Sequence, residues 1–157
     1  MCDNNKLLRL LSHKGVEIDK LSSHEEEAYV HEWFNRVVPE DKQQAAMELN
    51  CFGENKPFGD STIFMWGYLW HVFSFGLLDS VKEEDAKREL NSILKEEAIM
   101  LDYLNRDAYR LKGISIVSAD VFDSGEDILL TCNNYKWTYA KTHEPDLGPY
   151  FHYIRLL

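Results

Sequence analysis

The chain has 157 residues, 45% hydrophobic and 13% aromatic, which is enough material for one domain with a full core. Its formal charge is −10 at pH 7, from 17 Lys and Arg against 27 Asp and Glu. This charge argues against DNA, RNA and anionic membrane as the main partner, because those surfaces attract clustered Lys and Arg.

The sequence shows no sign of export or of membrane insertion. No basic segment followed by a long apolar run opens the chain. The longest apolar stretch, residues 63–78, is interrupted by His71 and Ser74 and is shorter than the roughly 18–20 residues that span a bilayer. Three scattered cysteines without a CxxC pair suit a reducing compartment. We therefore expect a cytoplasmic, soluble protein forming a single domain over residues 1–157.

The first third of the chain predicts helices. Residues 5–13 carry leucines on one face of a short helix, and residues 16–21 follow in an extended rhythm. A second helix then begins at a capping box, formed either by Ser22 with Glu25 or by Ser23 with Glu26. Its buried stripe has the spacing i, i+3, i+4, i+7 and consists of Val30, Trp33, Phe34 and Val37. A third helix after Pro39 is expected to turn one face inward, namely Ala45, Leu49 and Phe52.

The middle of the chain predicts a strand, a helix and another strand. Residues 68–75 are rich in aromatic and β-favouring residues and predict a strand, with a buried helix over residues 61–73 as the alternative. Ser80 with Glu83 predicts the start of a helix whose inward residues are Ala86, Leu90, Ile93 and Leu94. Residues 98–104 predict a strand buried on both faces. This order indicates one crossover unit, and hence one parallel strand pair.

The last part of the chain predicts a hairpin. Ser118 is expected to cap a short helical turn, and Asn133 with Asn134 to form a tight turn between two strands. The second strand alternates its aromatic residues onto one face, namely Tyr135, Trp137 and Tyr139. A turn at Gly148 leads into a final strand over residues 150–156. The fold class is therefore α+β, with N-terminal helices packed on a small mixed, mainly antiparallel sheet that ends in a C-terminal hairpin.

One polar loop near the C-terminus is the best candidate for a site. It contains His143, Glu144 and Asp146, and of these His143 and Asp146 are better placed to pair, since adjacent extended residues point to opposite faces. The expected aromatic and histidine neighbours of this loop are Trp137, Tyr139, Tyr150 and His71. Together they form a candidate ligand-binding or partner-binding site, to which no catalytic role is assigned.

Metal binding is an alternative for the same loop. His143, Glu144 and Asp146, with His152 and His71 close by, are ligand types that suit a divalent cation. No HExxH and no paired zinc-site spacing accompanies them, and histidines and carboxylates more often hold a loop through hydrogen bonds. We therefore expect no metal and no cofactor.

Several strings resemble a small uncharacterised bacterial family, the domain of unknown function numbered 4275. They are Leu69-Trp-His-Val-Phe-Ser74, then Trp137-Thr-Tyr, Thr142-His-Glu144 and Gly148-Pro-Tyr-Phe151, and the likeness extends to the N-terminal part. The resemblance implies an intracellular, single-domain bacterial protein and brings no established activity.

Three functions remain open. The first is a non-enzymatic protein-interaction module, resembling the acidic immunity proteins that neutralise basic toxins, because nine acids face three bases between Glu17 and Glu48. The second is a small hydrolase or metal-dependent enzyme that uses His143 and Asp146. The third is a small-ligand binder near Trp137, Tyr139 and Tyr150. The oligomeric state is not determined by these patterns.

Overall fold

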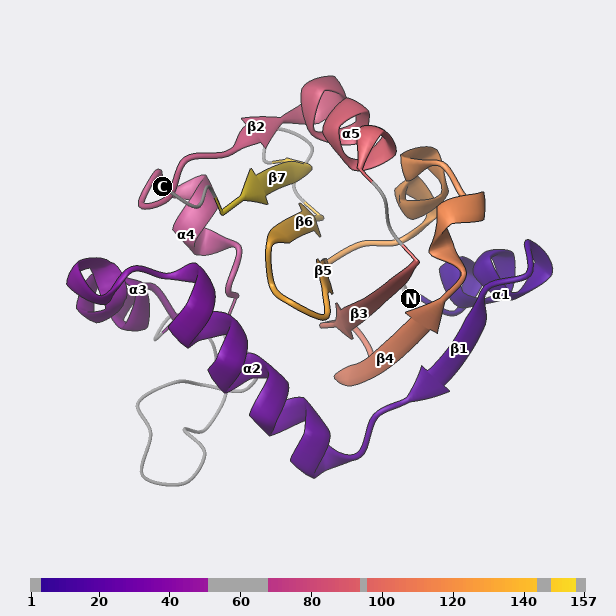
Figure 1. Ribbon diagram of the computed structural model, residues 1–157, viewed down its shortest axis with the longest axis horizontal. Coiled ribbons are helices and arrows are strands. Elements are labelled where there is room, and N and C mark those ends of the chain that lie inside the picture. The colour runs from indigo at the N-terminus through magenta and orange to yellow at the C-terminus, as the bar shows by residue number, and fades with distance from the viewer. Residues whose placement is uncertain (1–3, 51–67, 94–95, 144–147, 155–157) are drawn as a thin grey trace.

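A seven-stranded sheet forms the centre of the part of the chain that the structure describes. The structure is a computed structural model and describes residues 4–50, 68–93, 96–143 and 148–154 (Figure 1). In order across the sheet the strands are β1 (Glu17–Lys20), β4 (Asp107–Lys112), β3 (Glu97–Asp102), β5 (Ile128–Cys132), β6 (Trp137–Lys141), β7 (Tyr150–Tyr153) and β2 (Val81–Lys82).

Helices lie on both sides of this sheet. The described helices are α1 (Asn5–His13), α2 (Ser23–Val37), α3 (Gln43–Asn50), α4 (His71–Ser74) and α5 (Glu83–Ser92), with the 3-10 turns η1 (Glu40–Lys42), η2 (Ile114–Ile116) and η3 (Ala119–Ser124). In Figure 1, α2, α3 and α4 lie on one side of the strands, and α1 and α5 lie on the other. The predicted α+β class, with helices first and a late hairpin, is confirmed.

Strand β3 shows why helices pack on both faces of the sheet. Its alternate residues enter two separate cores: Ala98 and Met100 pack on the α1 and α5 side, whereas Ile99 and Leu101 pack on the α2 side. All four are buried, as the prediction of a strand buried on both faces required. Because successive side chains of a strand point to opposite faces, such a continuous apolar run needs a layer on each side.

The α2 stripe predicted from the sequence forms the first core. Val30, Trp33, Phe34 and Val37 are buried. The Trp33 indole N–H donates a hydrogen bond of 2.9 Å to Thr138 Oγ1 on β6, so the polar atom of this fully buried side chain is satisfied. Trp33 also meets Phe73 of α4 edge to face, with ring centroids 6.4 Å apart.

The start of α2 settles the capping alternatives. Ser22 is the N-cap, and its hydroxyl accepts from the Glu25 backbone N–H at 3.2 Å, while the Ser22 N–H donates to Glu25 Oε1 at 3.1 Å. Glu26 instead turns inward, where its carboxylate accepts from the Ala108 N–H of β4 at 3.3 Å. Burial raises the pKa of Glu26.

The N-terminal helix is tied to the sheet by a buried polar cluster. Asn4 donates to Asp102 Oδ1 at 2.6 Å and to the carbonyl of Glu126 at 2.9 Å, and it accepts from the Glu126 N–H at 2.9 Å. Asp102 also accepts from the backbone of Leu104 and from both nitrogens of Asn105. Burial raises the pKa of Asp102, and these donors oppose that effect.

The prediction of a strand over residues 68–75 is wrong. Residues 71–74 form the short helix α4, while the backbone N–H groups of Phe73 and Ser74 both donate to the Trp70 carbonyl. Val72 and Phe73 are both buried, which a strand with one buried face does not allow. Aromatic β-propensity is weaker here than packing against α2 and the sheet. Most of the alternative helix, residues 61–73, lies outside the described residues.

The predicted crossover unit and its parallel pair are also wrong. Strand β3 pairs antiparallel with both β4 and β5, and every strand pair among the described residues is antiparallel. The predicted helix is present as α5, but it begins at Glu83, later than a cap at Ser80 predicts, because Val81 and Lys82 pair with β7 as an edge strand. Ala86 and Leu90 are buried, as expected.

The predicted inward face of α3 is wrong at Ala45. Ala46 is fully buried, whereas Ala45 is exposed. The 3-10 turn η1 lies between Pro39 and α3, so the α-helix begins at Gln43 and not directly after Pro39. The side chain of Leu49 and the whole of Phe52, the other two residues predicted for this face, lie outside the described part of the chain.

The hairpin turn is confirmed, but its strain falls on a different residue. Asn133 and Asn134 occupy the turn, closed by a bond from the Tyr135 N–H to the Cys132 carbonyl at 3.0 Å. Tyr135, and neither asparagine, has a positive φ of 60°. This residue acts as a bulge that reverses the alternation, so Tyr135 packs on the α2 side while Trp137 packs on the opposite side.

Candidate functional site

His143 and Asp127 form a close pair at the end of β6. Asp127 Oδ1 accepts from the His143 backbone N–H at 2.9 Å and lies 2.8 Å from the ring Nδ1, with Oδ2 3.1 Å from the same nitrogen. The carboxylate is nearly buried, at 8% side-chain exposure, whereas the imidazole is 49% exposed. A buried acid holding the ring of an exposed histidine is the arrangement that orients an imidazole for proton transfer.

A cleft of about 400 Å³ adjoins this pair. Its walls come from the start of α5, from η3 and from the two ends of the loop between β6 and β7. The lining residues that carry charge or polarity are Glu83, Glu84, Lys87, Asp123, Glu126, Lys141, Thr142 and His143. The acids exceed the lysines, so the cleft does not favour an anionic ligand.

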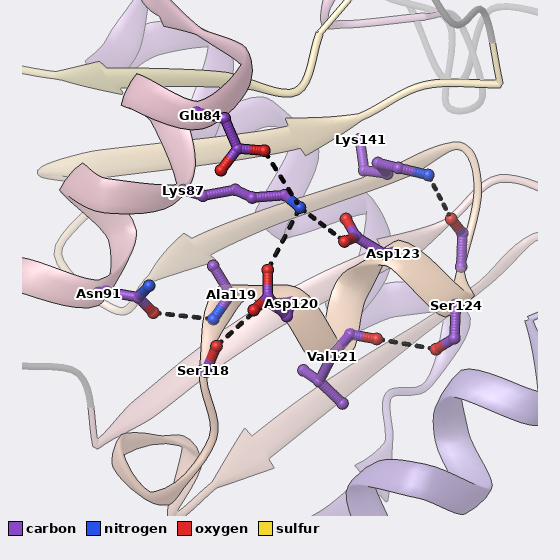
Figure 2. Close-up of polar contacts among 11 residues, drawn as sticks. Glu84, Lys87, Asn91, Ser118, Ala119, Asp120, Val121, Asp123, Ser124 and Lys141 are labelled. Carbon is purple, nitrogen blue, oxygen red and sulfur yellow. Dashed lines mark hydrogen bonds and ion pairs between the residues drawn. The ribbon is translucent and has the colours of Figure 1, made fainter.

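Lys87 is held by three carboxylates at the wall of this cleft. Its ammonium lies 2.6 Å from Asp123, 3.3 Å from Asp120 and 3.8 Å from Glu84, as Figure 2 shows. The hydrogen bond to Asp123 is the main reason that the pKa of Lys87 is raised. Lys87 therefore stays protonated and acts as a bridge between α5 and η3, rather than as a nucleophile.

The rest of this wall is also built from internal contacts. Lys141 donates to the carbonyl of Gly125 at 2.9 Å, and Asn91 accepts from the Ala119 N–H at 2.8 Å (Figure 2). Ser118 caps η3 by accepting from the Asp120 N–H, as predicted. Both lysines of the cleft, Lys87 and Lys141, therefore make contacts that stabilise the fold.

Two of the predicted aromatic site residues belong to the core. Trp137 stacks on Phe151, with centroids 6.2 Å apart, and is 4% exposed. Tyr139 is fully buried against Phe122, and burial raises the pKa of its hydroxyl. Both lie on the α1 and α5 side of the sheet.

Tyr150 and His71 lie on the opposite side. Tyr150 is fully buried, and its ring lies 6.2 Å from that of Phe73. His71 contacts Tyr68, Trp70 and Phe75 edge to face around α4. The sheet therefore separates Tyr150 and His71 from Trp137 and Tyr139, and the expected aromatic pocket that joins them does not form.

His152 lines a second cleft, of about 600 Å³, near β2 and β7. Its Nδ1 lies 2.6 Å from the Asp79 carbonyl, so this nitrogen donates. Burial lowers the pKa of His152, and the Asp79 carbonyl and the Asp79 charge oppose this effect. The cleft also includes Val81 and Tyr153, which are 39% and 48% exposed.

Glu144 and Asp146 lie outside the described residues, so the expected pairing of His143 with Asp146 stays a prediction. The carboxylate that holds His143 in the structure is Asp127, which sequence reasoning missed. It lies sixteen positions earlier, directly before β5, with a positive φ of 54°. Spacing along the chain carries no signal for such a contact, although the Gly125-Glu-Asp127 corner marks a turn.

Metal ligands and membrane spans were examined in the described ranges. Within them, no three His, Cys, Asp or Glu side chains lie close enough together to hold a metal ion. Across the same ranges, no helix combines the length and the apolar character needed to cross a bilayer.

The other charged feature is a set of exposed acids on α2 and on the segments before and after it. Eight of the nine acids between Glu17 and Glu48 are exposed, and Glu26 is the buried exception. We call the exposed set the acidic surface; it consists of Glu17, Asp19, Glu25, Glu27, Glu32, Glu40, Asp41 and Glu48. The three bases of this segment all have internal partners: Lys20 pairs with Asp107, Arg36 with Glu32, and Lys42 donates to the Leu77 carbonyl.

The fold and these features define an acidic α+β domain whose antiparallel sheet is covered on both faces. The family profile described as Domain of unknown function (DUF4275) matches residues 6–151, and the chain belongs to this family, as its motifs led us to expect. No curated protein and no solved structure matches the chain.

Proposed function

We propose that this protein is a non-enzymatic protein-binding module of the bacterial cytoplasm, which holds a basic partner on its acidic surface. The observation that carries this proposal is the exposure of eight acids along α2 and its ends, where the bases are tied to internal partners. Such a surface attracts a cationic protein over long range and increases the association rate. A basic toxin neutralised by an acidic immunity protein is the type of complex that fits.

Charge reversal on this surface tests the proposal. Glu27→Lys with Glu40→Lys changes two exposed acids that make no structural contact described above. The matched control, Asp85→Lys with Glu89→Lys, makes the same change in net charge on α5, across the sheet. Glu26 is left intact, since its carboxylate accepts from β4.

A protein captured from cells by the wild-type chain is purified, and its association rate is measured by surface plasmon resonance. The acidic-surface variant is expected to associate about tenfold more slowly at low salt, with a difference that shrinks as salt rises, while the control keeps nearly the wild-type rate. Equal rates for the two variants, or a captured partner without a basic surface, would overturn the proposal.

A second candidate function is acid–base catalysis at His143. The specific observation is the Asp127 carboxylate at 2.8 Å from the ring, next to a cleft of about 400 Å³. In this function the imidazole exchanges a proton with substrate, while Asp127 fixes its tautomer and orientation. A screen against activated ester and phosphoester substrates tests it, with His143→Gln expected to lower any turnover by about a hundredfold or more. A silent screen, or turnover that survives this substitution, would rule the candidate out.

A further inference from the structure

One cleft next to α2 combines carboxylates of the acidic surface with aromatic rings. A hollow of about 400 Å³ opens between α2, the sheet and the hairpin turn. Its polar lining comes from Glu25, Glu32, Arg110 and Asn133, and its apolar lining from Leu21, Ala28, Tyr29, Ile99 and Tyr135. The rings of Tyr29 and Tyr135 lie 5.5 Å apart, so carboxylates and aromatic faces meet in one concave place.

The two carboxylates of this cleft, Glu25 and Glu32, each have partners within the protein. Hydrogen bonds from Ser22 are the main reason that the pKa of Glu25 is lowered, with further help from Arg110. Glu32 is half exposed and pairs with Arg36 at 2.8 Å. The cation of the lining, Arg110, lies 3.1 Å from Glu97 outside the cleft, so its charge is already countered.

The chain itself shows how a cation binds here. The Arg36 guanidinium lies 5.4 Å above the Tyr135 ring and 2.8 Å from the Glu32 carboxylate. A guanidinium held by a carboxylate and an aromatic face together is a favourable cation–π arrangement. Arg36 does not line the cleft, but it contacts the same carboxylate and the same ring that an external cationic side chain in the cleft would contact.

We propose that the cleft between Glu32, Glu25 and Tyr135 binds an arginine side chain of the basic partner, in competition with Arg36. This inference rests on the proposed protein-binding function and names its anchoring contact. An arginine fits better than a lysine, because its flat guanidinium pairs with a carboxylate and stacks on a ring at once. Removal of Arg36 strengthens binding at this cleft.

The test uses a small probe and the intact protein, so it does not depend on the partner. N-acetyl-arginine amide is titrated into 15N-labelled protein, and N-acetyl-citrulline amide, which has the same shape without the charge, is the matched probe. The arginine probe is expected to give saturable shifts at the amides of Glu32, Asn133 and Tyr135. The citrulline probe is expected to bind at least about tenfold more weakly, because it lacks the charge that both carboxylates and the ring attract.

Three variants, two of them with a matched control, show whether the arginine probe binds in this cleft. Glu32→Gln is expected to weaken the arginine probe by about tenfold or more, whereas Glu48→Gln, which removes the same charge outside the cleft, leaves it nearly unchanged. Tyr135→Leu is also expected to weaken binding of the arginine probe, because the aromatic ring is lost. Arg36→Gln strengthens it several-fold beyond any gain from Lys20→Gln, which removes an equal charge that pairs elsewhere.

The outcomes separate this inference from the function on which it rests. Three results would contradict arginine binding at the cleft, even if partner association follows the charge of the acidic surface. They are shifts spread over the whole acidic surface, equal affinities for the two probes, and equal effects of Glu32→Gln and Glu48→Gln. Saturable binding of the arginine probe, with the expected order of affinities among the variants, supports arginine binding at the cleft. This conclusion does not depend on the association rates of the charge-reversal variants.

Discussion

Single buried hydrogen bonds determine how side chains are placed in this protein. The bond from the Trp33 indole to Thr138 Oγ1 joins α2 to β6 inside the first core. Thr138→Val keeps the shape of the side chain but leaves the indole N–H without an acceptor. We expect this variant to lose about 1–3 kcal/mol of unfolding free energy, the usual cost of an unsatisfied buried donor.

Urea denaturation measures the loss, and Thr138→Ser is the control because it retains the hydroxyl. The serine variant is expected to keep most of the wild-type stability. A valine variant as stable as the serine variant would show that the bond contributes nothing.

His152 provides a pH dependence of stability with a definite sign. Burial lowers its pKa in the folded state below the ordinary value of 6.5, so the unfolded chain binds a proton more readily. The folded state is then favoured above pH 6.5, and this contribution is lost as pH falls through the lowered pKa. We expect His152→Asn, which keeps a donor toward the Asp79 carbonyl, to remove this part of the acid sensitivity.

Urea denaturation of both proteins from about pH 5 to about pH 8 checks this dependence. The free energy of the wild type should fall more steeply than that of the variant as the solution becomes acidic below pH 6.5. Parallel curves across the range would contradict the expected role of His152.

Helix α2 begins where local chemistry dictates. The capping box of Ser22 and Glu25 satisfies backbone N–H groups of the first turn that no helical carbonyl reaches. Ser22→Ala is expected to lose about 1 kcal/mol, the usual cost of removing a serine N-cap. Ser23→Ala, one residue inside the helix, should change stability by no more than a few tenths, and chemical denaturation compares the two. Equal losses would assign the cap to neither residue.

The elements that sequence reasoning predicted well are those with strong local patterns. The α2 stripe, the α1 helix over residues 5–13 and the Asn133–Asn134 turn all follow from spacing, capping or turn chemistry. The segment at residues 68–75 was predicted wrongly, because a short aromatic run suits either a strand or a buried helix, and its neighbours decide between them. Edge strand β2, with two residues, is too short to leave a pattern.

At the level of the whole molecule, the central sheet couples two cores. Met100 and Leu101 are adjacent on β3, are fully buried and face opposite layers. We expect Met100→Ala and Leu101→Ala each to cost about 2–5 kcal/mol, as for other large buried side chains cut to alanine. Both variants should still unfold in one cooperative transition, because the layers share every strand of the sheet.

Tryptophan fluorescence and far-UV circular dichroism together check this coupling. The two signals are expected to give the same midpoint for each variant. Ile116→Ala, at a position 62% exposed, is the control and should change stability by about 0.5 kcal/mol or less. Separate midpoints in either core variant would show that the two layers unfold independently.

The amino-acid sequence by itself determined the acidic charge, the α+β class, the buried faces of the long elements and, through its motifs, the family. These properties depend on composition and on contacts between residues close in the chain. Only the tertiary structure decided that Asp127 holds His143, that the sheet separates Trp137 from Tyr150, and that Tyr135 joins α2 at the acidic cleft. Each of these depends on strand order and on the phase of a bulge, which local patterns do not encode because a shift of one residue moves a side chain to the other face.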